Sequence, residues 1–222
     1  MNGITITDVY HTCMPFDLAV IDLDNTLYAA ESGVFARMDK RMTAYVASQL
    51  GVDDAEANRL RIKYWKEYGT TLRGMMLHHN MEPEGFLHDV HDIDAHELIG
   101  RDELLDRALA RLPGRKVIHT NGIREHAERI LEALGVLHHF ERIYDIRFND
   151  YIPKPDSETL AMLIEAEGCD PERTLVVDDM GENLAAAARL GCKTVWITRG
   201  VENGTWDYHI PSFHHLPDVM GR

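Results

Sequence analysis

Two aspartates, Asp22 and Asp24, follow directly on the apolar run Leu18–Ile21, which has the composition of a buried strand. Burying a carboxylate costs free energy unless it is paired, hydrogen-bonded or bound to a metal ion. Side chains alternate along an extended chain, so residues two apart point the same way. The pair therefore predicts a divalent-cation site with a second acid beside it. One carboxylate could act as a nucleophile and the other could move a proton.

Other polar residues stand at the ends of later strand-like segments or on a loop between them. They are Thr120 at the end of the segment 116–120 and Asn121 after it, Lys154, and Asp178 and Asp179 after the segment at 173–177. In a parallel sheet the carboxyl ends of the strands meet at one edge, where ligands bind. Acids without thiolate ligands favour a hard cation such as Mg²⁺. The hydroxyl, ammonium and backbone N–H donors suit phosphoryl oxygens, so the pattern predicts a phosphoryl-transfer site.

Strand and helix signals alternate through most of the chain that must position these residues. The predicted strands are 18–22, 116–120, 142–148, 173–177 and 193–198, and the predicted helices between them are 102–112, 123–134, 157–167 and 182–190. This alternation is typical of an α/β fold with a doubly wound, Rossmann-like parallel sheet.

Residues 30–96 carry helical periodicity and no strand signal. Helices are predicted at 32–50, 55–68, 72–79 and 83–90, with Gly51 and the Gly69-Thr70-Thr71 turn as breaks. We therefore predict two domains: an α/β core formed by residues 1–29 and 97–222, and an inserted all-helical cap at 30–96. Residues 1–15 carry little signal and are expected to form a loose arm.

The overall composition limits the partners. With 222 residues and a formal net charge of −14, the chain is a poor candidate for binding a nucleic-acid duplex. A small phosphorylated ligand needs only a local positive site and a metal. No apolar run approaches the roughly 20 residues that span a bilayer, and the three cysteines are widely spaced. We expect a cytoplasmic protein without a membrane partner, either a monomer or a homodimer.

Four motifs in this order resemble those of the haloacid dehalogenase-like hydrolase superfamily. They are Asp22-Leu23-Asp24-Asn25-Thr26, Thr120 in the segment 118–122, Lys154 between Pro153 and Pro155, and Val177-Asp178-Asp179. The helical insertion also stands where that family places a cap. The resemblance implies that Asp22 is the nucleophile and Asp24 the general acid/base. It also implies a phosphatase, because the dehalogenase branch lacks the second acid.

The resemblance assigns the remaining site residues as well. Thr120, Asn121 and Lys154 would bind the phosphate, although Thr120 could instead cap the helix beginning near 123. Mg²⁺ would be bound by Asp22, by the backbone carbonyl of Asp24, by Asp179 directly, and by Asp178 directly or through water. Asn183 would support this loop, in which Met180 stands where many members carry a small hydroxyl residue.

A finer resemblance, to pyrimidine 5′-nucleotidases, lies in the cap segment 64–74 and in Asp24–Tyr28, together with His126-Ala127. It implies a nucleoside monophosphate substrate such as UMP or CMP, with Tyr64, Tyr68 and Arg73 as specificity residues. Plain packing of these side chains in the cap is the alternative.

Three other functions stay open. The site could act on another metabolite such as a sugar phosphate, or pass the phosphoryl group to a second hydroxyl as a phosphomutase or phosphotransferase does. A receiver-type signalling domain also uses acids, Thr and Lys around Mg²⁺, but its acidic pair comes near the first strand. A zinc site at the cap histidines, which are His78, His79, His88, His91 and His96, is disfavoured because their spacing fits no closed tetrahedral site.

Overall fold

The computed structural model describes residues 16–198, 200 and 205–220, and its centre is a six-stranded sheet. The strands are β1 (Leu18–Ile21), β2 (Arg115–His119), β3 (Arg142–Tyr144), β4 (Thr174–Asp178), β5 (Lys193–Ile197) and β6 (Tyr208–Ile210). All the pairings are parallel, and the order across the sheet is β3-β2-β1-β4-β5-β6. The predicted doubly wound α/β fold is confirmed.

The strand order reverses between β1 and β4. From β1 the chain adds β2 and β3 on one side, then crosses over and adds β4, β5 and β6 on the other. Ile21 pairs with Ile118 of β2 and Val177 of β4, so these three strands end side by side. Such a reversal leaves a crevice at the carboxyl ends of the strands, which is where open α/β sheets bind ligands.

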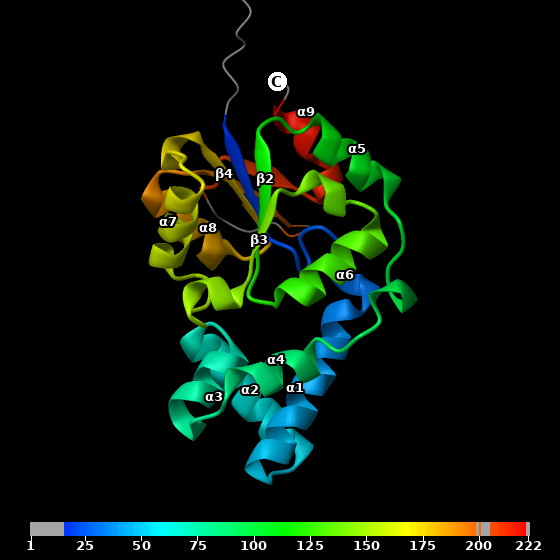
Figure 1. The fold of residues 1–222 in the computed structure, drawn as a ribbon, viewed down its shortest axis with the longest axis vertical. Helices are drawn as coiled ribbons and strands as arrows, with labels where there is room; N and C mark the ends of the chain where they lie inside the picture. The colour runs from blue at the N-terminus through cyan, green and yellow to red at the C-terminus, as the bar shows by residue number, and fades with distance from the viewer. Residues whose placement is uncertain (1–15, 199, 201–204, 221–222) are drawn as a thin grey trace, which may run out of the picture.

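Helices cover both faces of the sheet (Figure 1). They are α5 (Glu103–Arg111), α6 (Arg124–Leu134), α7 (Ser157–Ala166), α8 (Gly181–Leu190) and the short α9 (Leu216–Met220). Leu18 and Val20 pack with α7 and α8, whereas Ala19 and Ile21 pack with α5 and α6. The alternation of side chains along β1 thus gives one hydrophobic cluster on each face.

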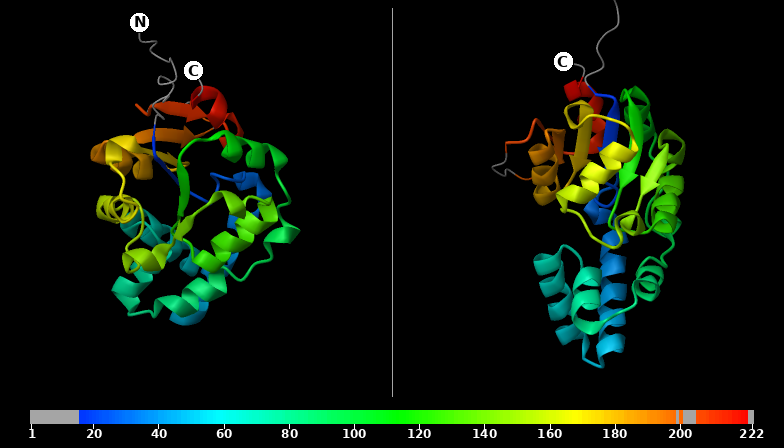
Figure 2. Two further views of the ribbon diagram at one scale, coloured as in Figure 1. Left: turned by 45° about the horizontal axis from the view of Figure 1, so that its top comes forward. Right: turned by 60° about the vertical axis from the view of Figure 1, so that its left-hand side comes forward.

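Four helices follow β1 before the core resumes. They are α1 (Val34–Leu50), α2 (Asp54–Tyr68), α3 (Thr71–His79) and α4 (Pro83–Val90). Gly51 ends α1 in a left-handed conformation, and the carboxylate of Asp53 accepts a hydrogen bond from Glu56 N at the start of α2. Figures 1 and 2 show the four helices gathered at the carboxyl-end side of the sheet. The predicted domain limits, 30–96 and the remainder, stay a proposal.

The predicted elements fail in two places. The segment 142–148 is not one strand: β3 stops at Tyr144, and the carboxylate of Asp145 accepts a hydrogen bond from Arg147 N to start a 3₁₀ turn at Ile146–Asn149. The strand at 193–197 is not the last one, because β6 pairs beyond it. β6 has only three residues, too few to show a period. The arm predicted at 1–15 lies outside the described residues.

Further 3₁₀ turns occur at Ala30–Ser32, Ala95–Glu97, Leu137–His139, Pro171–Arg173 and Phe213–His215. Within the described part of the chain, every helix is too short or too polar to cross a bilayer.

Candidate active site

Asp22 lies at the point where the strand order reverses. Its backbone N–H donates to Val177 O at 2.9 Å, which continues the β1–β4 ladder by one residue. Asn25 then adopts a positive φ of 62°, a conformation that Asn tolerates better than most residues. The chain consequently turns back, and the Thr26 hydroxyl donates to Asp22 Oδ2 at 2.7 Å. The carboxylate is buried, with 7% of the residue exposed.

Lys154 connects the ends of three strands. Its ammonium donates to Asp22 Oδ1 at 2.6 Å, to Asp178 Oδ2 at 3.0 Å and to the His119 carbonyl at 3.0 Å. Burial alone would lower the pKa of this lysine, but the two carboxylates outweigh it and the pKa is raised. Lys154 is therefore a fixed positive charge between two acids that are far apart in the sequence.

Asp178 and Asp179 have different surroundings. Asp178 accepts hydrogen bonds from Met180 N at 2.9 Å and from Asn183 Nδ2 at 2.8 and 2.9 Å, in addition to Lys154. Asn183 thus supports this loop, as expected. Asp179 is only half-buried, and its carbonyl accepts from the Trp196 indole at 2.9 Å. Among the described residues, the Asp179 carboxylate therefore has fewer hydrogen-bond partners than the Asp178 carboxylate.

In this site the negative charge of the three carboxylates exceeds the positive charge of the Lys154 ammonium. Asp22, Asp178 and Asp179 each offer an oxygen within 4.8 Å of the others. Burial raises the pKa of Asp22 well above its usual range; Lys154 opposes that rise and the neighbouring acids add to it. Burial and the charge of Asp178 raise the pKa of Asp179 to about 7. An all-oxygen set with surplus negative charge fits a hard divalent cation such as Mg²⁺.

Thr120 and Asn121 follow β2, which ends at His119, one residue before the end of the predicted strand. The Thr120 hydroxyl is buried and accepts a hydrogen bond from Gly122 N at 2.9 Å. It does not cap the following helix, because α6 begins after Ile123 without a side-chain cap. Asn121 Oδ1 accepts from Lys154 N at 2.8 Å, and its Nδ2 donates to the Lys154 carbonyl at 3.4 Å. The amide side chain of Asn121 therefore braces the lysine loop.

Asp24 has donors that sequence reasoning did not assign to it. The Tyr28 hydroxyl donates to Asp24 Oδ1 at 2.5 Å, and His126 Nε2 lies 3.2 Å from the same oxygen. Burial pushes the pKa of Asp24 upward, but the contacts with His126 and Tyr28 outweigh it and the pKa is lowered. Tyr28 lies four residues beyond Asp24, whereas His126 is on α6 and only the fold brings it close.

The helical insertion touches the lysine loop directly. Gly69, between α2 and α3, has a positive φ of 83°, and a Cβ atom there would lie 3.0 Å from Lys154 O and 3.1 Å from Pro153 Cγ. A side chain at Gly69 would push these two segments apart. The α2–α3 turn therefore lies beside the candidate site.

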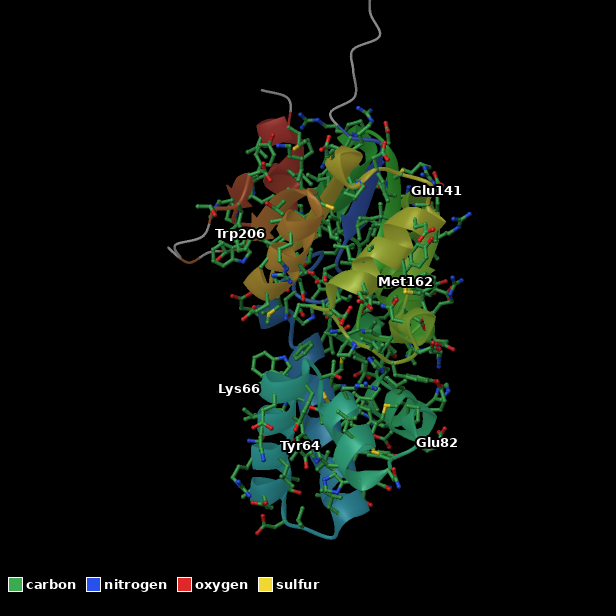
Figure 3. All side chains as sticks on the ribbon, turned by 90° about the vertical axis from the view of Figure 1, so that its left-hand side faces the viewer. Tyr64, Lys66, Glu82, Glu141, Met162 and Trp206 are labelled. Carbon is green, nitrogen blue, oxygen red and sulfur yellow. The ribbon has the colours of Figure 1, made fainter. Side chains whose placement is uncertain are left out.

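The three predicted specificity residues lie in different surroundings. Tyr64, labelled in Figure 3 on the helical insertion, is buried. A Cβ on Gly74 would come within 2.3 Å of its ring, and its hydroxyl lies 2.7 Å from His79 Nε2. The Tyr68 hydroxyl lies 2.7 Å from His78 Nε2. Arg73 is half-buried, and among the described residues no acid pairs with its guanidinium. The contacts of Tyr64 are those of a packing residue, and Arg73 keeps free donors.

In the part of the chain that the structure describes, the histidines between residues 78 and 96 form no metal-binding group. Within the described ranges, the sets of side chains close enough to share an ion are Asp22 with Asp178 and Asp179, and Asp106 with His138 and His139. Neither includes a histidine from the insertion.

An ion-pair network joins the insertion to the core away from the acids. The Glu84 carboxylate at the start of α4 accepts from Arg147 Nε at 3.0 Å, from Arg147 Nη2 at 2.8 Å and from the Tyr151 hydroxyl at 2.7 Å. These contacts, the hydrogen bonds from Arg147 first, lower the pKa of Glu84 to about 2.

Replacing Glu84 with Gln is expected to lower the free energy of unfolding by about 1 kcal/mol at pH 7, a charge-assisted contact discounted for partial exposure. A carboxyl whose pKa is depressed on folding stabilises the fold above its unfolded value near 4.5. This contribution is lost as pH falls toward about 2. Urea unfolding at pH 7 and pH 3 should therefore show the difference between the two proteins shrinking in acid.

Glu103 is a matched control, because it pairs with Arg107 at 4.0 Å on an exposed surface. The Glu103→Gln protein should unfold like the wild type. A Glu84→Gln deficit of unchanged size at both pH values would contradict the assignment of the ion pair.

This chain belongs to the haloacid dehalogenase-like hydrolase family, whose model matches residues 16–191. Members of this family are hydrolases. It is similar to Phosphate metabolism protein 8 of Saccharomyces cerevisiae, with 25% identity over 187 residues. The match covers 77% of this chain and 58% of the yeast protein, so the chain spans well under two thirds of that relative's length.

Solved structures share the whole fold. A HAD phosphatase from Thermococcus onnurineus matches with a TM-score of 0.63 and 20% identity, covering 92% of this chain and 98% of that one. The L-2-haloacid dehalogenase of Xanthobacter autotrophicus matches with a TM-score of 0.62 and 16% identity, covering 93% and 98%. A HAD hydrolase of Bacillus subtilis bound to magnesium gives 0.62 and 14%, covering 93% and 99%. At these identities the likeness shows the fold and leaves the substrate open.

Proposed function

We propose that this protein is a Mg²⁺-dependent phosphomonoester hydrolase that forms an aspartyl-phosphate on Asp22. The observation that supports it best is the Lys154 ammonium, which bridges Asp22 and Asp178 where the strand order reverses. A second acid, Asp24, stands two residues away with hydrogen-bond donors of its own. An aspartate nucleophile with a separate acid/base fits phosphate ester hydrolysis, which needs a proton for the leaving oxygen.

The reaction takes two steps. A carboxylate oxygen of Asp22 attacks phosphorus, the bond to the leaving alcohol breaks, and Asp24 gives its proton to the leaving oxygen. Asp24 then takes a proton from a water molecule, whose oxygen attacks the same phosphorus and releases phosphate and free Asp22.

The other residues of the site bind and orient. The Thr120 hydroxyl, the Lys154 ammonium and the backbone N–H groups near Asn121 hold the phosphoryl oxygens. Asp22, Asp178, Asp179 and the Asp24 carbonyl would hold Mg²⁺, which supplies positive charge to the phosphoryl oxygens when bound. Lys154 also keeps Asp22 oriented for attack, because its hydrogen bond fixes one carboxylate oxygen.

The substrate we propose is a pyrimidine nucleoside monophosphate such as UMP or CMP. The support is the resemblance of segment 64–74 to nucleotidases and the position of the α2–α3 turn beside Lys154. The yeast relative is named for phosphate metabolism, which fits any phosphomonoesterase. Sugar phosphates and transfer to a second hydroxyl remain the alternatives with the same chemistry.

A dehalogenase is the competing reaction, since solved dehalogenases share the fold. Asp24 favours the phosphatase, because hydrolysis of an alkyl halide releases a halide ion that needs no proton. A receiver-type signalling domain fits less well, because the acidic pair follows β4 and helices α1–α4 follow β1.

Phosphate release from a panel of nucleotides and sugar phosphates, with 2-chloropropionate as the halide substrate, tests the proposal. The expected result is Mg²⁺-dependent phosphate release that stops on chelation with EDTA, and no chloride release. Turnover of the haloacid without phosphatase activity would overturn it. Added alcohols that capture the phosphoryl group efficiently would favour a phosphotransferase.

Replacement of Arg73 with Ala should affect substrate specificity, whereas replacement of Tyr64 with Ala should affect stability. Arg73 pairs with no acid among the described residues. Loss of its guanidinium is expected to lower kcat/KM for UMP and CMP by roughly tenfold, the value of one charge-assisted hydrogen bond, with little effect on p-nitrophenyl phosphate. Loss of the buried Tyr64 ring should cost about 3 kcal/mol of stability and affect both substrates equally. Tyr68→Phe, which removes only a hydroxyl bonded to His78, tests the third predicted specificity residue in the same assays.

These outcomes separate specificity from packing. If Arg73→Ala lowers kcat/KM equally for the nucleotide and for the generic ester, Arg73 has a structural role in the insertion. If the Tyr64→Ala protein is thermally stable and has an altered base preference, Tyr64 contacts the substrate.

The proposals on the cap, the cellular location and the oligomeric state rest on the sequence. We propose residues 30–96 as a cap that covers the site and selects the substrate. A cytoplasmic location suits the free thiols of Cys169 and Cys192. A monomer or a homodimer are both compatible with this site, which one chain completes.

A further inference from the structure

Asp24 is held at one oxygen by two donors from different elements. Tyr28 approaches Oδ1 from the turn after β1, and His126 approaches the same atom from the first turns of α6. Each donor prefers a particular direction at a carboxylate, so two donors on Oδ1 fix the plane of the group. The second oxygen, Oδ2, is left for proton transfer.

His126 is fully buried, and its ring nitrogens differ. Nε2 lies 3.2 Å from Asp24 Oδ1, while Nδ1 has no hydrogen-bond partner among the described residues. A buried N–H without an acceptor is costly, whereas an unpaired ring lone pair costs less. The geometry therefore places a proton on Nε2, and this N–H donates to Asp24.

We propose that His126 is the positioning residue of the general acid/base Asp24. This inference rests on the proposed phosphomonoesterase function, because it concerns the proton that Asp24 gives to the leaving oxygen. His126 acts through Asp24 and needs no contact with the substrate. Tyr28 supplies the second support from the same turn as Asp24 itself.

His91 connects His126, which contacts Asp24, to the helical insertion. The His91 ring packs against the His126 ring with centroids 4.8 Å apart, and its Nδ1 lies 2.7 Å from Leu87 O in α4. The His91 carbonyl accepts from Arg129 Nη2 on α6 at 2.7 Å. The orientation of Asp24 therefore depends on how the end of α4 seats on α6.

The test uses phosphate esters whose leaving groups differ in basicity. A p-nitrophenolate leaves without much help from an acid, whereas an alkoxide needs a proton in the transition state. His126→Leu is expected to lower kcat by roughly 10²-fold on an alkyl phosphate, the lower end of a general acid contribution, and only a few-fold on p-nitrophenyl phosphate. His126→Gln places an N–H near the position of Nε2 and should recover most of the loss.

Leu131→Ala is the matched control for damage to α6, because Leu131 is equally buried on the same helix and belongs to the hydrophobic cluster. It should lower thermal stability without changing the dependence on the leaving group. Equal losses on both esters for His126→Leu would overturn the positioning role and leave a packing role only. If the wild-type protein hydrolyses no phosphate ester, the proposed function fails instead, so the two failures are distinguishable.

Discussion

Replacing Asp22 with Asn is expected to lower kcat for phosphate esters by on the order of 10⁴-fold or more, the scale seen when an enzyme loses its nucleophile. An amide cannot form the acyl-phosphate bond, while its shape still fits the space between Thr26 and Lys154. Turnover of p-nitrophenyl phosphate in the presence of Mg²⁺ measures the loss.

The same change should leave the fold intact. Burial and the nearby acids raise the pKa of Asp22, so ionised Asp22 costs folding free energy at neutral pH when no cation is bound. The neutral amide removes that cost together with the ion pair to Lys154. We expect the metal-free variant to unfold at a temperature close to that of the wild type, with a smaller stabilisation by Mg²⁺.

Asp24→Asn is the matched control, because it changes the other acid of the pair. It should still form the aspartyl-phosphate slowly and hydrolyse it poorly, so phosphate stays bound covalently to the protein. Near-normal turnover by the Asp22→Asn protein would refute the nucleophile assignment. Covalent phosphate on the Asp22→Asn protein would show that another residue is the nucleophile.

Lys154→Met is the second change with a large expected effect. The ammonium neutralises Asp22 and Asp178 in a buried site, and removing one partner of a buried ion pair costs about 3–5 kcal/mol. The loss of a donor to the phosphoryl oxygens should lower kcat by on the order of 10²–10³-fold. Urea unfolding of the metal-free protein and steady-state kinetics measure the two effects separately.

Lys116→Met is the matched control for this experiment. Lys116 is half-buried in β2 and donates to the Gly114 carbonyl at 3.2 Å, with no carboxylate on its ammonium among the described residues. It should change stability by less than about 1 kcal/mol and leave kcat unchanged. A Lys154→Met protein as stable and as active as the wild type would show that the bridge between Asp22 and Asp178 is dispensable. Partial rescue of its stability by Mg²⁺ is expected, because the cation replaces the missing positive charge.

The helices that lie between β1 and β2 were predictable because their signals are local. Gly51 ends α1 as expected, and Asp53 caps α2. Each of these choices depends on the backbone within one turn. The strands at 18–21 and 174–178 were predictable from short apolar runs that end in acids. The end of β3 was not, because Asp145 starts a turn that only its hydrogen bond to Arg147 N defines.

The sequence also predicted that Asp22, Lys154 and Asp178 would lie close together, and the Lys154 ammonium bonds to both acids. Their roles stay a prediction. Asp22, Thr120, Lys154 and Asp178 each lie at a strand end or on an adjoining loop, and parallel strands bring those ends to one edge. The sequence did not predict how they share their contacts. The amide of Asn121 braces the Lys154 loop, and Asn183 binds both oxygens of Asp178.

Asp22 and Asp24 were recognisable from the sequence by itself, since two carboxylates after a buried strand are costly without a cation or a reaction. That local chemistry predicted a cation or phosphoryl site, and the alternation of strand and helix signals predicted the α/β sheet that carries it. Only the tertiary structure decided what holds Asp24, because His126 lies 102 residues away and approaches through the packing of α6. It also decided that Tyr64 packs within the insertion and that Gly69 lies against the lysine loop. Contacts between distant segments depend on how helices and strands pack, and no spacing within one segment encodes them.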